Sequence, residues 1–159
     1  MPTPYAEYVG DGDAVDVLRT SLAEYRTLVP RIPPDTWVRR WAPGKWTLGE
    51  IMLHVTQWEM ILGIRVRCAL AMRPFTLQPM NQDPFMAVES KAVDGPTAAA
   101  AFEGVRGMNL ALALSLSPDD RRVIAHHPER GKIDVNDLLV TLAGHSVHHL
   151  KQMQQTVGP

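Results

Sequence analysis

The chain has a single cysteine among its 159 residues, so no disulfide bond can form within it. It also has almost no net charge, because it contains 16 Lys and Arg residues and 17 Asp and Glu residues. Nucleic-acid binding needs clustered Lys and Arg, and the sequence therefore argues against a nucleic-acid partner.

No apolar run approaches the ~20 residues needed to cross a bilayer. Residues 1–10 lack the basic and apolar regions of a signal peptide. We therefore expect a cytoplasmic protein without a membrane partner.

No alternating apolar and polar pattern is long enough to predict a β-sheet. Hydrophobic residues make up 45% of the chain and charged residues 21%, which suits one folded domain over residues 1–159. Thirteen prolines divide the sequence, and proline is strongly disfavoured inside helices. Four windows with helical periodicity lie between them: 13–28, 47–72, 97–115 and 134–156. The sequence predicts an all-α protein, a four-helix bundle.

The second window has the clearest start signal. Thr47 and Glu50 have the spacing of a capping box, in which each side chain bonds an otherwise unpaired backbone N–H. Trp46 and Ile51 flank this cap at the spacing of a hydrophobic staple. Asp13 is a candidate N-cap for the first helix, and Asp134 is a candidate N-cap for the fourth helix.

The connection between the second and third helices, residues 73–94, is long and holds three prolines. Its length indicates a crossover along the bundle or a wall around a pocket. A helical turn is expected near residues 85–90.

Histidines give the main functional signal. His145 and His149 are four residues apart, so a helix places both rings on one face, one turn apart. His54 lies on the second helix and reaches the same height if the second and fourth helices run antiparallel. Three imidazoles suit Zn²⁺, Ni²⁺, Fe²⁺ or Cu²⁺ and leave a coordination position open, as in catalytic sites. We therefore predict a metal site formed by His54, His145 and His149.

Neighbouring polar residues have less certain assignments. His148 could be a fourth ligand, a proton shuttle or an ordinary neighbour, and we favour either an ordinary neighbour or a residue that orients a ligand. Gln152 and Thr141 lie on the ligand face, where either could hydrogen-bond a ligand ring. His126 and His127 are expected in a solvated loop.

Three segments resemble the DinB/YfiT-like superfamily of metal-binding four-helix bundles. They are GKWTLGEIMLH (44–54), LSPDD (116–120), and GKIDV (131–135) followed by H-x-x-x-H-x-x-Q (145–152). The resemblance implies an up-down-down-up bundle with a long crossover between helices 2 and 3, in proteins that are often homodimers. It also implies His54, His145 and His149 as ligands. Its members include transferases and isomerases that use bacillithiol or mycothiol, and others known only as metal-binding or stress-associated proteins.

Three functions remain open. The first is a metal-dependent S-transferase, in which a low-molecular-weight thiol attacks a small-molecule substrate. The second is a metal-dependent hydrolase, with Glu59 or His148 as candidate base. The third is a non-catalytic, stress-associated dimer whose metal only stabilises it, and the simplest alternative is a bundle that binds no metal.

Overall fold

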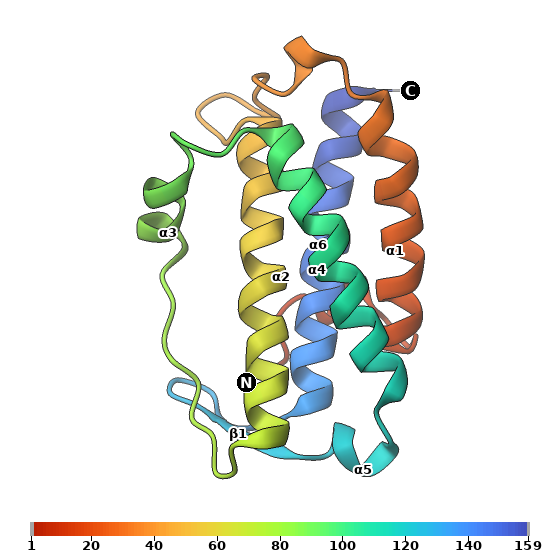
Figure 1. The fold of residues 1–159 in the computed structure, drawn as a ribbon, viewed down its shortest axis with the longest axis vertical. Coiled ribbons are helices and arrows are strands. Elements are labelled where there is room, and N and C mark those ends of the chain that lie inside the picture. Colours follow the sequence, from red (N-terminus) through yellow and green to blue (C-terminus); the bar gives the residue numbers. More distant parts are fainter. Residues whose placement is uncertain (1, 159) are drawn as a thin grey trace.

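The computed structural model describes residues 2–158 and consists mainly of four long helices (Figure 1). They are α1 (Ala14–Leu28), α2 (Leu48–Ala71), α4 (Gly95–Ser115) and α6 (Val135–Val157). Helices α1 and α6 run in one direction and α2 and α4 in the other, as Figure 1 shows. The helix α2 packs against both α4 and α6, and α1 against α4 and α6. The predicted four-helix, up-down-down-up bundle is confirmed.

Local capping explains where the long helices begin. The Thr47 hydroxyl accepts from the Glu50 N–H, and the Glu50 carboxylate accepts from the Thr47 N–H, which completes the predicted capping box of α2. Asp13 caps α1 as expected. Helix α4 begins at Gly95, two residues earlier than expected, because Asp94 caps it. Pro96 falls in the first turn, where its missing N–H would have had no partner in the helix.

The crossover 72–94 runs along the outside of α2, from the end of that helix back to the start of α4 (Figure 1). It contains α3 (Gln82–Glu89), which is longer than the turn expected at 85–90. Asn81 caps α3 by accepting from the Asp83 N–H. The Gln57 amide of α2 donates to the Glu89 carboxylate at 2.7 Å, and this bond ties α3 to the bundle.

A two-stranded antiparallel sheet was not expected. Strand β1 (Ile124–His127) pairs with β2 (Gly131–Asp134) just before α6, after the short helix α5 (Pro118–Arg121). The expectation of a loop for His126 and His127 is therefore wrong, although His126 is exposed to solvent as expected. Each strand has four residues and only one buried side chain, Ala125 or Ile133, so the period-two pattern is too short to detect.

The crossover also pairs with this hairpin. The His126 N–H donates to the Phe75 carbonyl at 2.9 Å, and the Leu77 N–H donates to the His126 carbonyl at 2.8 Å. The hairpin and the crossover thus form one wall at the end of the bundle where α6 begins. Within residues 2–158, no helix combines the length and the apolar character required to cross a bilayer.

Candidate metal centre

The three predicted ligands lie together between α2 and α6. His54 comes from α2, and His145 and His149 come from successive turns of α6. One ring nitrogen from each lies within 4.8 Å of the other two, and the Nε2 atoms of His54 and His145 are 3.0 Å apart. The three residues are only 2%, 3% and 5% exposed. The antiparallel course of α2 and α6 brings them to one height, as the sequence analysis required.

The ring orientations fit a divalent transition metal. His149 Nδ1 lies 2.7 Å from the Gln152 side-chain oxygen, so this nitrogen carries the proton and donates it. The lone pair of His149 Nε2 is then free, and this buried atom has no hydrogen-bond partner. A tetrahedral ion with bonds of about 2.0–2.1 Å separates its ligand nitrogens by about 3.3 Å. The 3.0 Å between the Nε2 atoms of His54 and His145 is close to that separation, and the His149 ligand nitrogen lies within 4.8 Å of both rings' ligand atoms.

Burial keeps the three rings neutral. It lowers the pKa of His54 to about 3, with smaller contributions from the charges of His149 and His148. Burial likewise lowers the pKa of His149 to about 4, although the hydrogen bond that His149 donates to Gln152 acts to raise it. The pKa of His145 is also well below its ordinary value, mainly through burial. Neutral imidazole is the form that binds metals, so near pH 7 no proton needs to leave.

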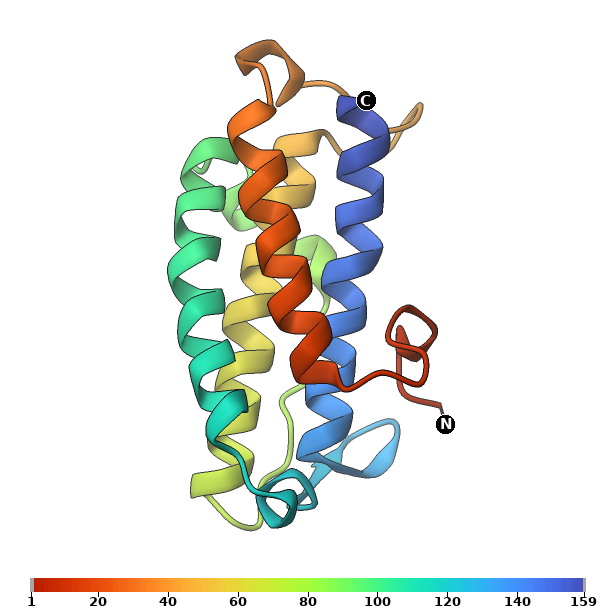
Figure 2. The ribbon, with the colours of Figure 1, turned by 90° about the vertical axis from the view of Figure 1, so that its right-hand side faces the viewer.

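Gln152 and His148 form a hydrogen-bonded layer behind His149. The Gln152 amide nitrogen lies 3.3 Å from His148 Nε2, and His148 Nδ1 lies 2.7 Å from the Tyr8 hydroxyl. His148 thus links α6 to the N-terminal segment and is outside the ligand cluster. Figure 2 shows this segment beside the first half of α6. Thr141 donates to the Asp137 carbonyl instead of a ligand ring.

Glu59 was expected as a candidate base, and the structure contradicts this role. Its carboxylate is buried on the α4 side of α2, where it pairs with the Arg106 guanidinium and accepts from the Asn109 amide at 3.0 Å. Arg106 also donates to the Ser21 hydroxyl at 3.0 Å and to a backbone carbonyl of α1. These bonds join α1, α2 and α4, and they leave Glu59 fully occupied.

Aromatic side chains surround the histidines. The Trp46 ring lies 4.7 Å from the His54 ring, and the Trp58 and Tyr5 rings lie 5.5 and 5.3 Å from His145, centre to centre. They shield the cluster from water and lower its local polarity, which strengthens electrostatic interactions there.

A cavity of about 120 Å³ opens beside His145. It is bounded by the N-terminal segment, α2, the crossover, the hairpin and α6. A wider hollow of about 510 Å³ lies next to it and shares Trp58, Arg65 and His127 as wall residues. Residues 73–94 therefore form a crossover and also part of a pocket wall, in line with both expectations.

Three residues of the cavity wall were not predicted from the sequence: Arg65, Arg130 and Tyr5. Arg65 could have been found, because it follows His54 by eleven residues, or three helical turns, and so shares its face. Arg130 lies in the turn between β1 and β2, and Tyr5 lies in the N-terminal segment. No local pattern places either of them near α6.

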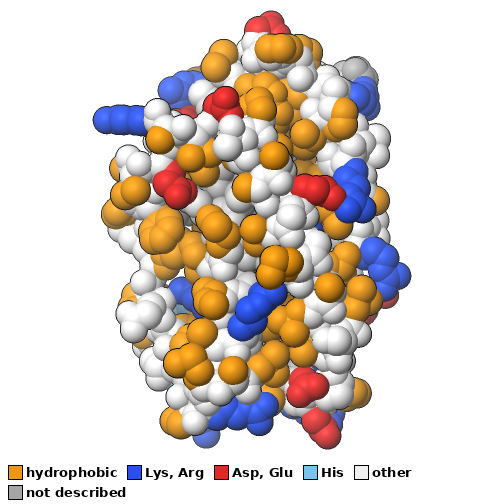
Figure 3. Space-filling model, viewed as in Figure 1, with side chains coloured by type: hydrophobic (Ala, Val, Ile, Leu, Met, Phe, Trp, Pro, Cys, Tyr) orange, Lys and Arg blue, Asp and Glu red, His pale blue; other side chains and the backbone are white. Residues whose placement is uncertain are grey.

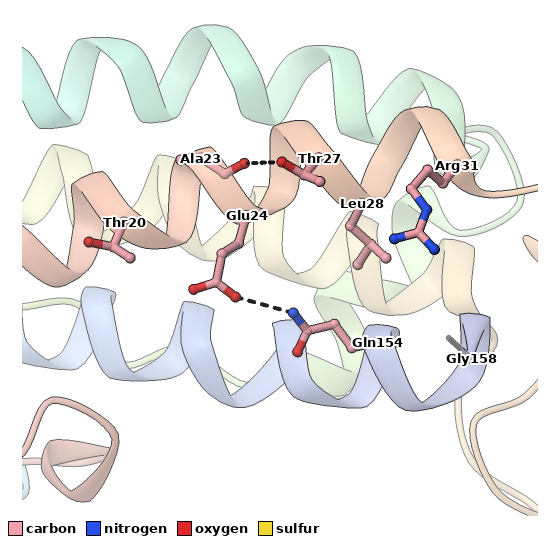
Figure 4. A pocket seen from close by; sticks show the side chains of 8 residues that line it. All are labelled: Thr20, Ala23, Glu24, Thr27, Leu28, Arg31, Gln154 and Gly158. Carbon is pink, nitrogen blue, oxygen red and sulfur yellow. Dashed lines mark hydrogen bonds between the residues drawn. The ribbon is translucent and has the colours of Figure 1, made fainter.

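Another hollow, of about 330 Å³, lies between α1 and the end of α6 (Figure 4). The Gln154 amide donates to the Glu24 carboxylate there at 3.2 Å. Its walls include none of the clustered histidines, so the cavity beside His145 is the better candidate for chemistry.

Several known proteins are similar to this chain in sequence or in fold. A protein of Oceanobacillus iheyensis named "Putative metal-dependent hydrolase" is 21% identical over 155 residues, covering 92% of this chain and 90% of its own length. The structure of YfiT from Bacillus subtilis, described as "a probable metal-dependent hydrolase with an unusual four-helix bundle topology", matches with a TM-score of 0.80. It is 20% identical, and the match covers 90% of this chain and 83% of YfiT.

The mycothiol-dependent maleylpyruvate isomerase has the same fold, with a TM-score of 0.73 and 13% identity. The match covers 96% of this chain but only 63% of the isomerase. The model of the DinB superfamily matches residues 18–153, a span that includes all three clustered histidines. Because this match spans most of the chain, the chain belongs to the DinB superfamily.

Proposed function

We propose that His54, His145 and His149 hold a divalent transition metal, Zn²⁺, Ni²⁺ or Fe²⁺, in an enzyme that transfers a thiol to a small molecule. One observation carries the proposal: three buried, neutral imidazoles converge, and one of them also lines a cavity. Three protein ligands leave a coordination position open, as catalytic sites require. The thiol would be mycothiol, on which the isomerase of the same fold depends, or bacillithiol.

The metal would supply Lewis-acid activation and lower the pKa of a thiol at its open position. The chain's own residues prepare the site for this. Gln152 accepts the Nδ1–H of His149 and so leaves the buried Nε2 lone pair of this ring free for a metal. Trp46, Trp58 and Tyr5 exclude water from the cluster. The cavity beside His145 gives the substrate a route to the reacting thiol.

Metal content is the first test. Protein without a polyhistidine tag would be analysed by inductively coupled plasma mass spectrometry, alongside His145→Ala and His149→Ala. His126→Ala is the matched control, because this histidine is exposed on β1. We expect near-stoichiometric metal in the parent and the control and its loss from the other two. No metal in the parent, even after reconstitution, would refute the site.

The transfer reaction is tested next. Metal-loaded parent would be incubated with an electrophile panel and bacillithiol or mycothiol, and conjugates would be detected by mass spectrometry. Thiol conjugation above the rate with the metal-free protein supports the proposal. Absence of any conjugate across the panel, in protein that retains its metal, contradicts it.

A metal-dependent hydrolase is the second candidate, and the names of two relatives favour it. Glu59 is not available as a base, and His148 is bonded to Tyr8 and Gln152 behind the cluster. His127 also lines both the cavity and the hollow outside it, but its Nδ1 already accepts from two backbone N–H groups and is not free to act as a base. An ester, amide and lactone panel would separate hydrolysis from thiol transfer. If neither thiol conjugation nor hydrolysis is detected, the non-catalytic, stress-associated role is favoured.

Three broader features belong to the same proposal. We place the enzyme in the cytoplasm, where reducing thiols are maintained, and treat residues 1–159 as one domain.

We also propose a homodimer, supported by exposed apolar side chains on the face of α2 and α4 that Figure 3 shows. The exposed apolar side chains of these two helices include Met60 and Ile64 of α2 and Met108 and Leu114 of α4. Sedimentation equilibrium would measure the mass, and a monomer at all concentrations would contradict the dimer.

A further inference from the structure

Two arginines in the wall of the cavity have no acidic partner. Arg65 comes from α2 and is only 8% exposed, and Arg130 comes from the turn between β1 and β2. No carboxylate among residues 2–158 lies within ion-pairing distance of either guanidinium. In contrast, the buried Arg106 pairs with Glu59. Partly buried cations without counter-ions are unfavourable, so their arrangement requires a reason.

Most hydrogen-bond donors of the two arginines are unused. Arg65 gives one N–H to the Gln78 carbonyl at 2.6 Å, and its guanidinium lies 5.8 Å from the centre of the Trp58 ring. Arg130 makes one long bond of 3.5 Å to the Thr3 hydroxyl, and its buried Nε–H has no partner. Each guanidinium has five N–H donors, so both can still bind an acceptor.

His127 adds a further donor to the same wall. Its Nδ1 accepts from the backbone N–H groups of Glu129 and Arg130, at 3.2 and 3.3 Å. The proton of the neutral ring is therefore on Nε2. Partial burial lowers the pKa of His127, and the charges of Arg130 and Arg65 lower it further, against the opposing charge of Glu129. The neutral ring is a donor, and none of the residues that line the 120 Å³ cavity is acidic.

We propose that Arg65 and Arg130 bind a carboxylate of the reacting molecule in the cavity beside His145. A planar guanidinium matches a carboxylate with two parallel hydrogen bonds, which fixes orientation as well as position. Because His145 lines the same cavity, a carboxylate held there directs the rest of the molecule toward the three histidines. This inference rests on the proposed function and names its substrate class: small organic acids, with the carboxylate on the electrophile or on the thiol.

Binding is measured first, without catalysis. Isothermal titration calorimetry would compare benzoate with benzamide, which has the same shape without the charge, in metal-free and zinc-loaded protein. The variants are Arg65→Met and Arg130→Met, which keep much of the apolar stem. Arg67→Met is the matched control, since Arg67 is on α2 but bonds Asn109 of α4. Arg65→Lys keeps the positive charge but removes the two parallel N–H donors of the guanidinium. The melting temperature of each variant shows whether it is folded.

We expect the parent to prefer benzoate over benzamide in both metal states, and salt to weaken benzoate binding. Arg65→Met and Arg130→Met should bind benzoate about ten- to a hundredfold more weakly, as charged hydrogen bonds predict, while Arg67→Met matches the parent. Equal binding of benzoate and benzamide, or unchanged benzoate affinity in folded Arg65→Met and Arg130→Met, would overturn the proposal.

Kinetics then identify which reactant carries the carboxylate. With one thiol, charged and neutral electrophiles are compared in the parent and in Arg65→Met. A rise in KM confined to the charged electrophile assigns the carboxylate to the electrophile, and a rise in KM for the thiol with both electrophiles assigns it to the thiol. Benzoate binding that requires the arginines, in a protein without conjugation activity, would retain the anion site and reject the transferase. If the protein conjugates thiols and neither arginine substitution changes benzoate binding or KM, the transferase is retained and the anion site is rejected.

Discussion

Removal of the metal should make stability depend on pH between 7 and 5. In the metal-free protein the pKa values of His54 and His149 are about 3 and about 4, against 6.5 for the unperturbed ring. Between these values the unfolded chain binds more protons than the folded one. The stability from keeping both rings neutral is therefore complete above about pH 6.5 and is lost as the pH falls.

The size of the loss follows from the distance below the unfolded pKa. Each ring contributes about 1.4 kcal/mol per pH unit, so at pH 5 each lowers the free energy of unfolding by about 2 kcal/mol. His54 and His149 together give about 4 kcal/mol, and His145 shifts in the same direction. The carboxyls of Asp94 and Asp120 have lowered pKa values and titrate below this window.

Urea unfolding of chelator-treated protein at pH 7 and pH 5 would measure the loss. His149→Ala should lose about 2 kcal/mol less than the parent over this interval, because one buried ring is gone. His126→Ala should behave like the parent, since this ring is exposed. A free energy of unfolding that stays constant within about 1 kcal/mol would refute the burial argument, because that change is smaller than one ring requires.

Three further predictions address the support of the site. Arg106→Met leaves the Glu59 carboxylate buried without its partner, and urea unfolding should show a loss of about 3–5 kcal/mol, partly restored by adding Glu59→Gln. Gln152→Ala frees the His149 ring, and competition with a chelator should show metal affinity lower by about ten- to a hundredfold. In Gly144→Ala the new Cβ would lie 2.1 Å from the Tyr5 carbonyl oxygen, so hydrogen exchange at residues 3–9 should become faster. Unchanged stability, affinity or exchange, respectively, would contradict each of them.

Features set by neighbouring residues could be predicted from the sequence. The Thr47–Glu50 capping box needs only residues three apart, and it forms as expected. The pairing of His145 with His149 follows from helical periodicity. His54 could be added because the second and fourth helices were assumed antiparallel, and their observed directions satisfy that condition.

Features set by distant partners could not be predicted. Glu59 was a candidate base because it follows His54 closely, but its environment is decided by Arg106, 47 residues away. The hairpin of β1 and β2 is stabilised partly by backbone bonds to Phe75 and Leu77 of the crossover. These bonds leave no periodic signal in side-chain type, so the loop expectation at 126–127 failed.

The ligands and the cavity walls come from different parts of the chain. The three histidines lie on α2 and α6, in a frame held by helix caps and by the buried pair of Glu59 and Arg106. Much of the wall lies in the crossover, the hairpin turn and the N-terminal segment, which are outside the four long helices. Substitutions in these segments can therefore change which molecule reaches His145 without moving a ligand. This separation explains physically how one bundle with three histidines can serve different substrates, and why the wall arginines are the place to look for specificity.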